Sequence, residues 1–141
     1  MPPFARSILF ILITFLFSSV ALGTLGDQYP DSLRKVEVKD QGYIQALLKF
    51  SHQNLYQNPE LAFYAGQEVA HLSDSMGLDS IRGQALYALA VARTMQTNYE
   101  ASLTWLDSAF GVFEALGDEK NGQMVNSLKG VNYDYMGHLN R

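Results

Sequence analysis

The chain has 141 residues, which fits a single domain, and it carries a net charge of −4 with no cysteine. The lack of cysteine excludes disulfides and thiolate metal sites, so the fold must be held by packing alone. Acidic residues outnumber basic ones by 14 to 10 and no Lys/Arg cluster is present. We therefore expect no nucleic-acid partner, because phosphates need basic side chains to neutralise them.

The N-terminal segment, residues 1–23, has the pattern of a secretory signal peptide. Arg6 is its only charged residue, an apolar run follows from Ile8 to Phe17, and small residues at Ala21 and Gly23 fit a cleavage site. The alternative is an uncleaved membrane anchor, but an apolar core of about 10–13 residues is short of the roughly 20 that span a bilayer. We predict export to the periplasm or cell envelope, with membrane contact only if this segment is retained.

Residues 24–40 are predicted to form a polar linker with at most one short helix, capped by Asp31 or Ser32 and reaching Val36. The helical pattern strengthens from Gln41 onward. Apolar or small residues then recur three and four apart, at Ile44, Leu47, Leu48, Ser51 and Leu55.

Residues 58–60 are the clearest helix start in the chain. Asn58 can cap the helix, Pro59 suits its first position, and Glu60 suits its first turn. The predicted helix follows Leu61, Ala65, Val69, Leu72 and Met76. We expect it to end at Gly77, residues 78–80 to form a loop, and Gly83 to open the next helix.

Residues 83–117 are predicted to form two helices joined by a short turn at residues 96–100. The stripe of the first helix lies at Leu86, Leu89, Ala90 and Arg93, of which only Arg93 is polar. The apolar stripe of the second helix lies at Leu103, Leu106, Phe110 and Phe113. Asn98 can cap the second helix, and Gly117 can close it in a left-handed conformation. We expect Phe110 and Phe113 to lie in the core.

The last part of the chain reads as a loop and one more helix. Residues 118–122 are polar and contain a glycine, so we expect a solvated loop. The last helix is predicted from about Gln123 to Met136, with a turn at Gly137 and His138.

The predicted units align with one another when the sequence is shifted along itself so that Gly77 falls on Gly117, an offset that we call the repeat shift. This repeat shift also aligns Ala62 with Ser102, Val69 with Ala109, Leu72 with Val112, Met76 with Leu116, and Ala90 with Gly130. Small residues recur where helices must approach closely, and large apolar residues recur where the pair needs filling. A fixed period of about 20–50 residues is typical of a solenoid built from repeated helical units.

On these residues the chain resembles the tetratricopeptide repeat family, in its variant with a longer second helix. The family's first-helix signature is matched at Leu86, Leu89 and Ala90, and its second-helix signature at Tyr99, Ser102, Leu106 and Ala109. Gly130, Tyr133 and Gly137 fit the first helix of a third unit. The chain departs from the family pattern at Phe50, Arg93 and Lys129.

The resemblance implies an all-α solenoid of about two and a half helical hairpins after the signal peptide. Its units would span residues 41–80, 81–120 and an incomplete 121–141. A narrower similarity is to the exported repeat regions of sensor kinases and regulators in bacteria of the Bacteroidetes type. Two functions stay open: a protein-binding or peptide-binding scaffold of the cell envelope, or the truncated sensory repeat region of a sensor kinase or transcription regulator.

The titratable residues do not indicate catalysis. His52, His71 and His138 fall in different units, and no pair has the spacing of metal ligands. His71 and Asp74 are three residues apart on a helix, where a surface hydrogen bond is the simpler interpretation. We expect no enzyme activity, no cofactor and no metal.

In a solenoid of helical pairs, the side of each first helix opposite its packing stripe lines a concave groove. The residues predicted for that groove are Leu47, Ser51, Asn54, Tyr87, Val91, Thr94, Met95, Val131, Asp134 and Tyr135. Their mixture of small, apolar and amphipathic side chains suits a peptide or a partner helix. The alternative is that the groove is only solvated surface.

Overall fold

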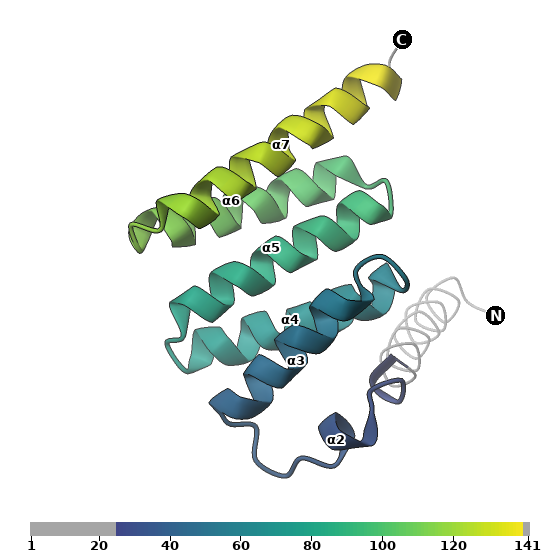
Figure 1. The fold of residues 1–141 in the computed structure, drawn as a ribbon, viewed down its shortest axis with the longest axis vertical. Helices are drawn as coiled ribbons and strands as arrows, with labels where there is room; N and C mark the ends of the chain where they lie inside the picture. The colour runs from purple at the N-terminus through teal and green to yellow at the C-terminus, as the bar shows by residue number, and fades with distance from the viewer. Residues whose placement is uncertain (1–24, 140–141) are drawn as a thin grey trace, which may run out of the picture. The chain divides into compact units, whose positions relative to one another are not determined.

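The computed structural model describes residues 25–139, apart from the side chain of Leu139. The predicted signal peptide at residues 1–23 lies outside the described residues. Within them the regular structure is entirely helical, which confirms the all-α prediction (Figure 1). The helices are α2 (Asp31–Arg34), α3 (Gln41–Asn54), α4 (Pro59–Ser75), α5 (Asp79–Met95), α6 (Tyr99–Ala115) and α7 (Glu119–Leu139). The chain divides into two compact units, residues 1–36 and 37–141, which are described separately.

The first unit contains α2, a single helical turn. Pro30 occupies the capping position with an extended backbone and makes no side-chain capping bond. Asp31 is already helical, and its carboxylate accepts hydrogen bonds from Arg34 at 2.5 Å and Lys35 at 2.7 Å. The predicted cap and the predicted extension to Val36 were both wrong, because Pro30 begins the helix and Asp31 pairs with the residues that end it.

In the second unit each helix packs mainly against the helix that follows it in the chain. α3 packs against α4, α4 against α5, α5 against α6 and α6 against α7, with minor contact between α3 and α5 and between α5 and α7. Figure 1 shows α3 with α4 and α5 with α6 as antiparallel neighbours, followed by α7. Each helix therefore buries its apolar stripe mainly against its neighbours in sequence.

The second unit repeats its helix boundaries with the predicted period. α4 spans residues 59–75, and the repeat shift carries these bounds onto residues 99–115, which are those of α6. Asn58 and Asn98 cap the two helices, each accepting a 3.2 Å hydrogen bond from the backbone N–H three residues on. Gly77 and Gly117 follow the two helices in left-handed conformations, with φ of 67° and 66°. These four residues confirm the predicted caps and terminators.

Gly83 lies inside α5 because the ring of Phe113 occupies the space beside it. A Cβ built at Gly83 would lie 2.6 Å from Cε1 of Phe113, which is closer than atoms pack. α5 begins before this point, at Asp79. The prediction that Gly83 opens the helix was wrong. The glycine is required here by close packing against Phe113 and not by the start of a helix.

α7 begins at Glu119, so the predicted solvated loop at 118–122 is mostly its first turn. The Asp118 carboxylate accepts a 3.1 Å hydrogen bond from the backbone N–H of Asn121. This bond satisfies one of the donors that a helix start leaves free, so a polar segment can still be helical. The helix also continues to Leu139, past the predicted turn at Gly137.

Phe113 is the largest fully buried side chain among the described residues. It belongs to a cluster with Ala90, Leu106, Ala109 and Val125, which joins α5, α6 and α7. The prediction that Phe113 lies in the core is confirmed. Phe110 lies at the margin of this cluster and is only partly buried.

Leu106→Ala is expected to lower the free energy of unfolding by about 2–5 kcal/mol, because it removes a fully buried side chain from between helices. Thr104→Ala is a matched control on the exposed face of α6 and should change the free energy by no more than about 0.5 kcal/mol. Urea unfolding followed by circular dichroism measures both. Equal losses in the two variants would contradict the packing described here.

Two of the departures from the family pattern have a structural explanation. The guanidinium of Arg93 lies 3.6 Å from the centroid of the Phe63 ring, and it also donates to the side chain of Gln96 at 2.6 Å. Arg93 therefore contacts an aromatic partner as an aromatic residue would. Lys129 lies over α6, where its ammonium pairs with Asp107 at 2.6 Å.

Candidate functional site

Four of the ten residues predicted for the groove lie in the interior. Leu47, Ser51, Val91 and Thr94 are at most 8% exposed. Ser51 donates a 2.7 Å hydrogen bond to the carbonyl of Ala62 on the next helix. The prediction was wrong for these four residues, because α3 and α5 are covered by neighbouring helices over more of their surface than one packing stripe.

Thr94 belongs to a buried polar triad with Ser102 and Asn132, one residue from each of α5, α6 and α7. The Thr94 hydroxyl lies 2.9 Å from both the Ser102 hydroxyl and the Asn132 carbonyl oxygen. The Asn132 amide donates to the Ser102 hydroxyl at 2.7 Å. The triad ties three helices together inside the core, so Thr94 serves the fold and is not available to a partner.

The other six predicted residues have side chains that reach the surface. Met95, Val131, Asp134 and Tyr135 are exposed, and Asn54 and Tyr87 are partly buried. The Tyr135 ring stacks on Tyr99 with 5.5 Å between centroids, and the Asn54 amide donates to the Phe50 carbonyl at 2.9 Å. Of the ten residues, only Tyr87 lines the hollow described next.

This hollow, which we call the groove hollow, has a volume of about 420 Å³ and opens where the first helices of the hairpins meet. Its lining residues are His52, Leu55, Gln84, Tyr87, Phe113, Asn121 and Met124. The buried ring of Phe113 comes from α6, and the other lining residues come from α3 and the residue after it, from α5 and from α7. The groove hollow therefore brings together α3, α5 and α7, which have only minor contact with one another elsewhere.

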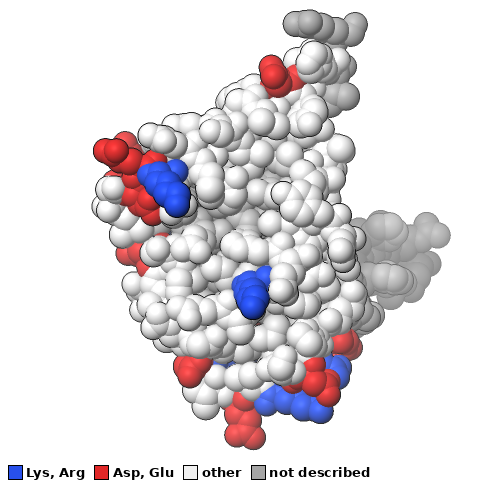
Figure 2. Space-filling model, in the orientation of Figure 1, with Lys and Arg blue, Asp and Glu red and all other residues white. Residues whose placement is uncertain are grey.

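The walls of the groove hollow are apolar and its polar groups are neutral. Desolvation lowers the pKa of His52, which keeps its imidazole uncharged at pH 7. Burial, together with the nearby Tyr56, raises the pKa of Tyr87 and keeps its phenol protonated. No acidic side chain, lysine or arginine is among the lining residues. In Figure 2 the face in view, where α3, α5 and α7 lie in front, carries few charged side chains.

This chemistry suits an apolar side chain held in the groove hollow while amide and imidazole groups bond to a peptide backbone. Gln84 offers two donors and an acceptor, Asn121 offers an acceptor and the one amide donor that is not bonded to Asp118, and neutral His52 offers one donor and one acceptor. A hollow of this volume lies within the usual range for small-ligand sites, about 300–1,000 Å³.

Two of the lining residues could have been found from the sequence. Gln84 lies three residues before Tyr87 on the same helix face, and the repeat shift aligns Gln84 with Met124. No sequence pattern indicates His52 and Asn121 as lining residues. Both lie near helix ends, and the relative positions of those ends depend on packing between helices.

The described part of the chain holds no cluster of three or more acidic or histidine side chains that could bind a metal ion. Among residues 25–139, no helix combines the length and apolar character that crossing a membrane requires. Comparison with protein-family models, curated proteins and solved structures gives no match.

Proposed function

We propose that this chain is a non-catalytic helical-repeat scaffold that binds a peptide or a segment of another protein. The observation that carries the proposal is the neutral, largely apolar groove hollow bounded by His52, Leu55, Tyr87 and Met124. The repeat of α4 in α6 and the resemblance to tetratricopeptide repeats support a solenoid whose first helices line the binding face. The apolar segment at residues 1–23 supports a role in the cell envelope.

The bound segment is expected to insert one large apolar side chain and to lie with its backbone along the rim. Because the lining residues carry no formal charge, an acidic or basic side chain in the groove hollow would lose its hydration without gaining an ionic partner. Specificity should therefore come from shape and from hydrogen bonds to Gln84 and Asn121.

Selection of peptides from a random displayed library against the full chain tests this proposal. Selected peptides should share an apolar or aromatic residue, and their affinity should fall about 10- to 30-fold on Tyr87→Ala, because truncation of a central aromatic removes a large contact. Fluorescence anisotropy with labelled peptides measures the dissociation constants.

Tyr133→Ala serves as the matched control. Tyr133 is 59% exposed and lies outside the groove hollow, so its truncation should leave peptide affinity unchanged. Circular dichroism melts of both variants separate a loss of binding from a loss of folding. Failure to select any peptide, or selected peptides that bind Tyr87→Ala as tightly as the wild type, would contradict the proposal.

A further inference from the structure

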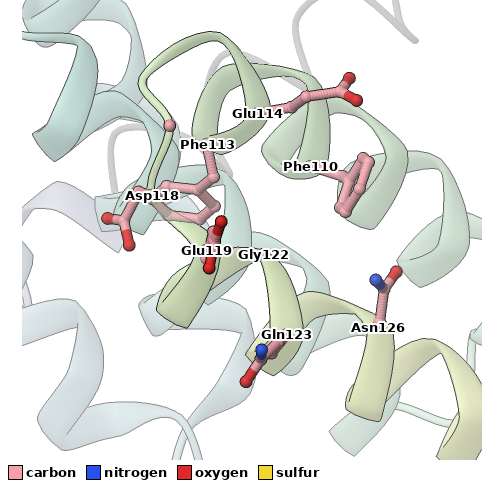
Figure 3. Close-up of a pocket in the computed structure, with 9 residues that line it drawn as sticks. Phe110, Phe113, Glu114, Asp118, Glu119, Gly122, Gln123 and Asn126 are labelled. Carbon is pink, nitrogen blue, oxygen red and sulfur yellow. The ribbon is translucent and has the colours of Figure 1, made fainter.

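A second hollow, of about 390 Å³, lies where α6 ends and α7 begins (Figure 3). It is lined by Phe110, Phe113, Glu114, Gly117, Asp118, Glu119, Gly122, Gln123 and Asn126. Two aromatic rings thus lie beside three carboxylates, and Gly122 contributes no side chain. We call this site the end notch, and it differs from the groove hollow in every lining residue except Phe113.

The same place one repeat earlier, between α4 and α5, holds an ion-pair network. Arg82 on α5 donates to Asp74 at 2.8 Å and lies 3.2 Å from Asp79. The repeat shift carries Arg82, Asp74 and Asp79 onto Gly122, Glu114 and Glu119. The end notch therefore retains both acids of the network and has lost the arginine that pairs with them.

The earlier place is also flanked by a helix, namely α6, although its ion pairs remain partly exposed, with 32% of the Arg82 side chain and 64% of the Asp74 side chain accessible. Ser108, Gly111 and Ala115 of α6 line a hollow of about 270 Å³ together with Arg82 and Asp79. The Phe113 ring of the same helix fills the space at Gly83. The chain itself thus shows which kind of element lies beside such a place: a helix with small residues near the charges and an aromatic ring packed against the preceding helix at Gly83.

The acids of the end notch have no cationic partner within residues 25–139, since no ion pair involves Glu114 or Glu119. The third acid, Asp118, accepts hydrogen bonds from the side chain and backbone of Asn121, which lower its pKa, with a smaller contribution from Lys120. Figure 2 shows acidic side chains gathered at this edge of the molecule with a basic side chain among them. The notch as a whole remains acidic.

We propose that the end notch docks a helix of a partner protein, placed on α7 as α6 is placed on α5. That helix brings an aromatic or large apolar side chain to Phe110 and Phe113, and it brings a lysine or arginine between Glu114 and Glu119. Charge complementarity and the internal precedent of α6, which packs on α5 beside Arg82, support this docking. The docking does not depend on the proposed function of the groove hollow.

The probe is a labelled peptide with the sequence of residues 99–117 carrying Gly111→Arg. This peptide copies α6 and adds the missing cation at residue 111. In the protein, residue 111 of α6 lines the same hollow as Arg82 of α5. Fluorescence anisotropy with the full chain should show saturable binding. The affinity should fall at least tenfold between 50 and 500 mM NaCl, a range chosen because salt screens an exposed ion pair. The unsubstituted peptide should bind at least tenfold more weakly.

Gly122→Arg is the decisive variant, because it restores from within the cation that the notch lacks. A Cβ at residue 122 would meet only Cε2 of Phe110 at 3.7 Å, an ordinary contact, so a side chain can leave the helix here and extend into the notch that Gly122 lines. We expect an unchanged or raised Tm and at least a tenfold loss of peptide affinity. Gly122→Ala is the matched control: it changes helix propensity in the same direction but leaves the notch open, so it should bind as the wild type does.

The charge requirement is tested separately with Glu114→Gln combined with Glu119→Gln. This variant should bind the Gly111→Arg peptide no better than the unsubstituted peptide. Equal affinity of the wild type and Gly122→Arg would overturn the proposal, and so would equal affinity for the two peptides. Sedimentation that shows a dimer of the full chain, lost in Gly122→Arg, would overturn it in favour of a second copy as the occupant. Loss of binding in Tyr87→Ala but not in Gly122→Arg would assign the peptide to the groove hollow.

Discussion

Phe113→Ala is expected to lower the free energy of unfolding by about 3–5 kcal/mol, because it removes an aromatic ring from the core. Phe113 is fully buried, and its ring fits against Gly83 in the preceding helix. A domain of this size is stable by only about 5–15 kcal/mol, so the variant should be partly unfolded or close to unfolding at physiological temperature. Urea unfolding followed by circular dichroism measures the loss.

The contact with Gly83 allows a sharper test than the loss alone. Gly83→Ala places a methyl group against the ring and should be destabilising in the wild type, because the nearest ring atom would lie 2.6 Å away. In the Phe113→Ala background the same methyl group enters vacated space and should be neutral or stabilising. The two losses must therefore be far from additive. Additive losses would mean that the ring does not lie against Gly83.

Phe110→Ala is the control for a generic aromatic truncation. Phe110 lies on the same helix but is only partly buried. Its loss should be clearly smaller than that of Phe113→Ala, since less apolar surface leaves water on folding. A larger loss for Phe110→Ala would contradict the assignment of the core to Phe113.

Asn132→Ala is expected to lower the free energy of unfolding by about 2–4 kcal/mol. The loss combines a small cavity with the removal of one hydrogen bond from each of two buried hydroxyls. Asn132 is fully buried and bonds to Thr94 and Ser102. In the variant the Ser102 hydroxyl loses a donor and the Thr94 hydroxyl loses an acceptor, although Thr94 can still donate to the carbonyl of Ala90 at 3.2 Å. Chemical denaturation again measures the effect.

The chain contains an apolar counterpart of two members of this triad, whereas the third position, that of Thr94, is taken by Asn54. The repeat shift places Ala62 and Ala92, both fully buried, where Ser102 and Asn132 stand one unit later. Ser102→Ala should therefore cost less in the Asn132→Ala background than in the wild type, because the Ser102 hydroxyl has already lost its bond to Asn132 and keeps only the one to Thr94. If the losses in the two backgrounds are equal, the triad does not act as a network.

The sequence predicted the features that depend on residues within one helical turn. Asn58 and Asn98 cap their helices and Gly77 and Gly117 close theirs, because capping and left-handed closure act between residues close together in the chain. The repeat period was visible for the same reason. Each unit repeats its local signals, and α6 follows α4 at the distance that separates Gly117 from Gly77.

The candidate site was predicted less well. The sequence predicts both Tyr87 and Thr94 as groove residues. Tyr87 lines the groove hollow, whereas Thr94 lies in the core. Both residues lie away from the predicted stripe of the same helix, so periodicity could not separate them. The difference arises because Asn132 of α7 reaches Thr94, while Tyr87 lines the open groove hollow.

By itself the sequence determined the all-helical class, the helix caps and the repeat, since these follow from apolar spacing and from short-range hydrogen bonds. Only the tertiary structure decided the role of Gly83, which makes room for a neighbouring helix and does not open its own. Gly77 has the left-handed backbone that the sequence predicted, whereas Gly83 lies against Phe113, a residue distant in sequence. Whether a residue lies in the core or at a binding surface depends on what other helices bring to it, and that is a property of packing between residues distant in sequence.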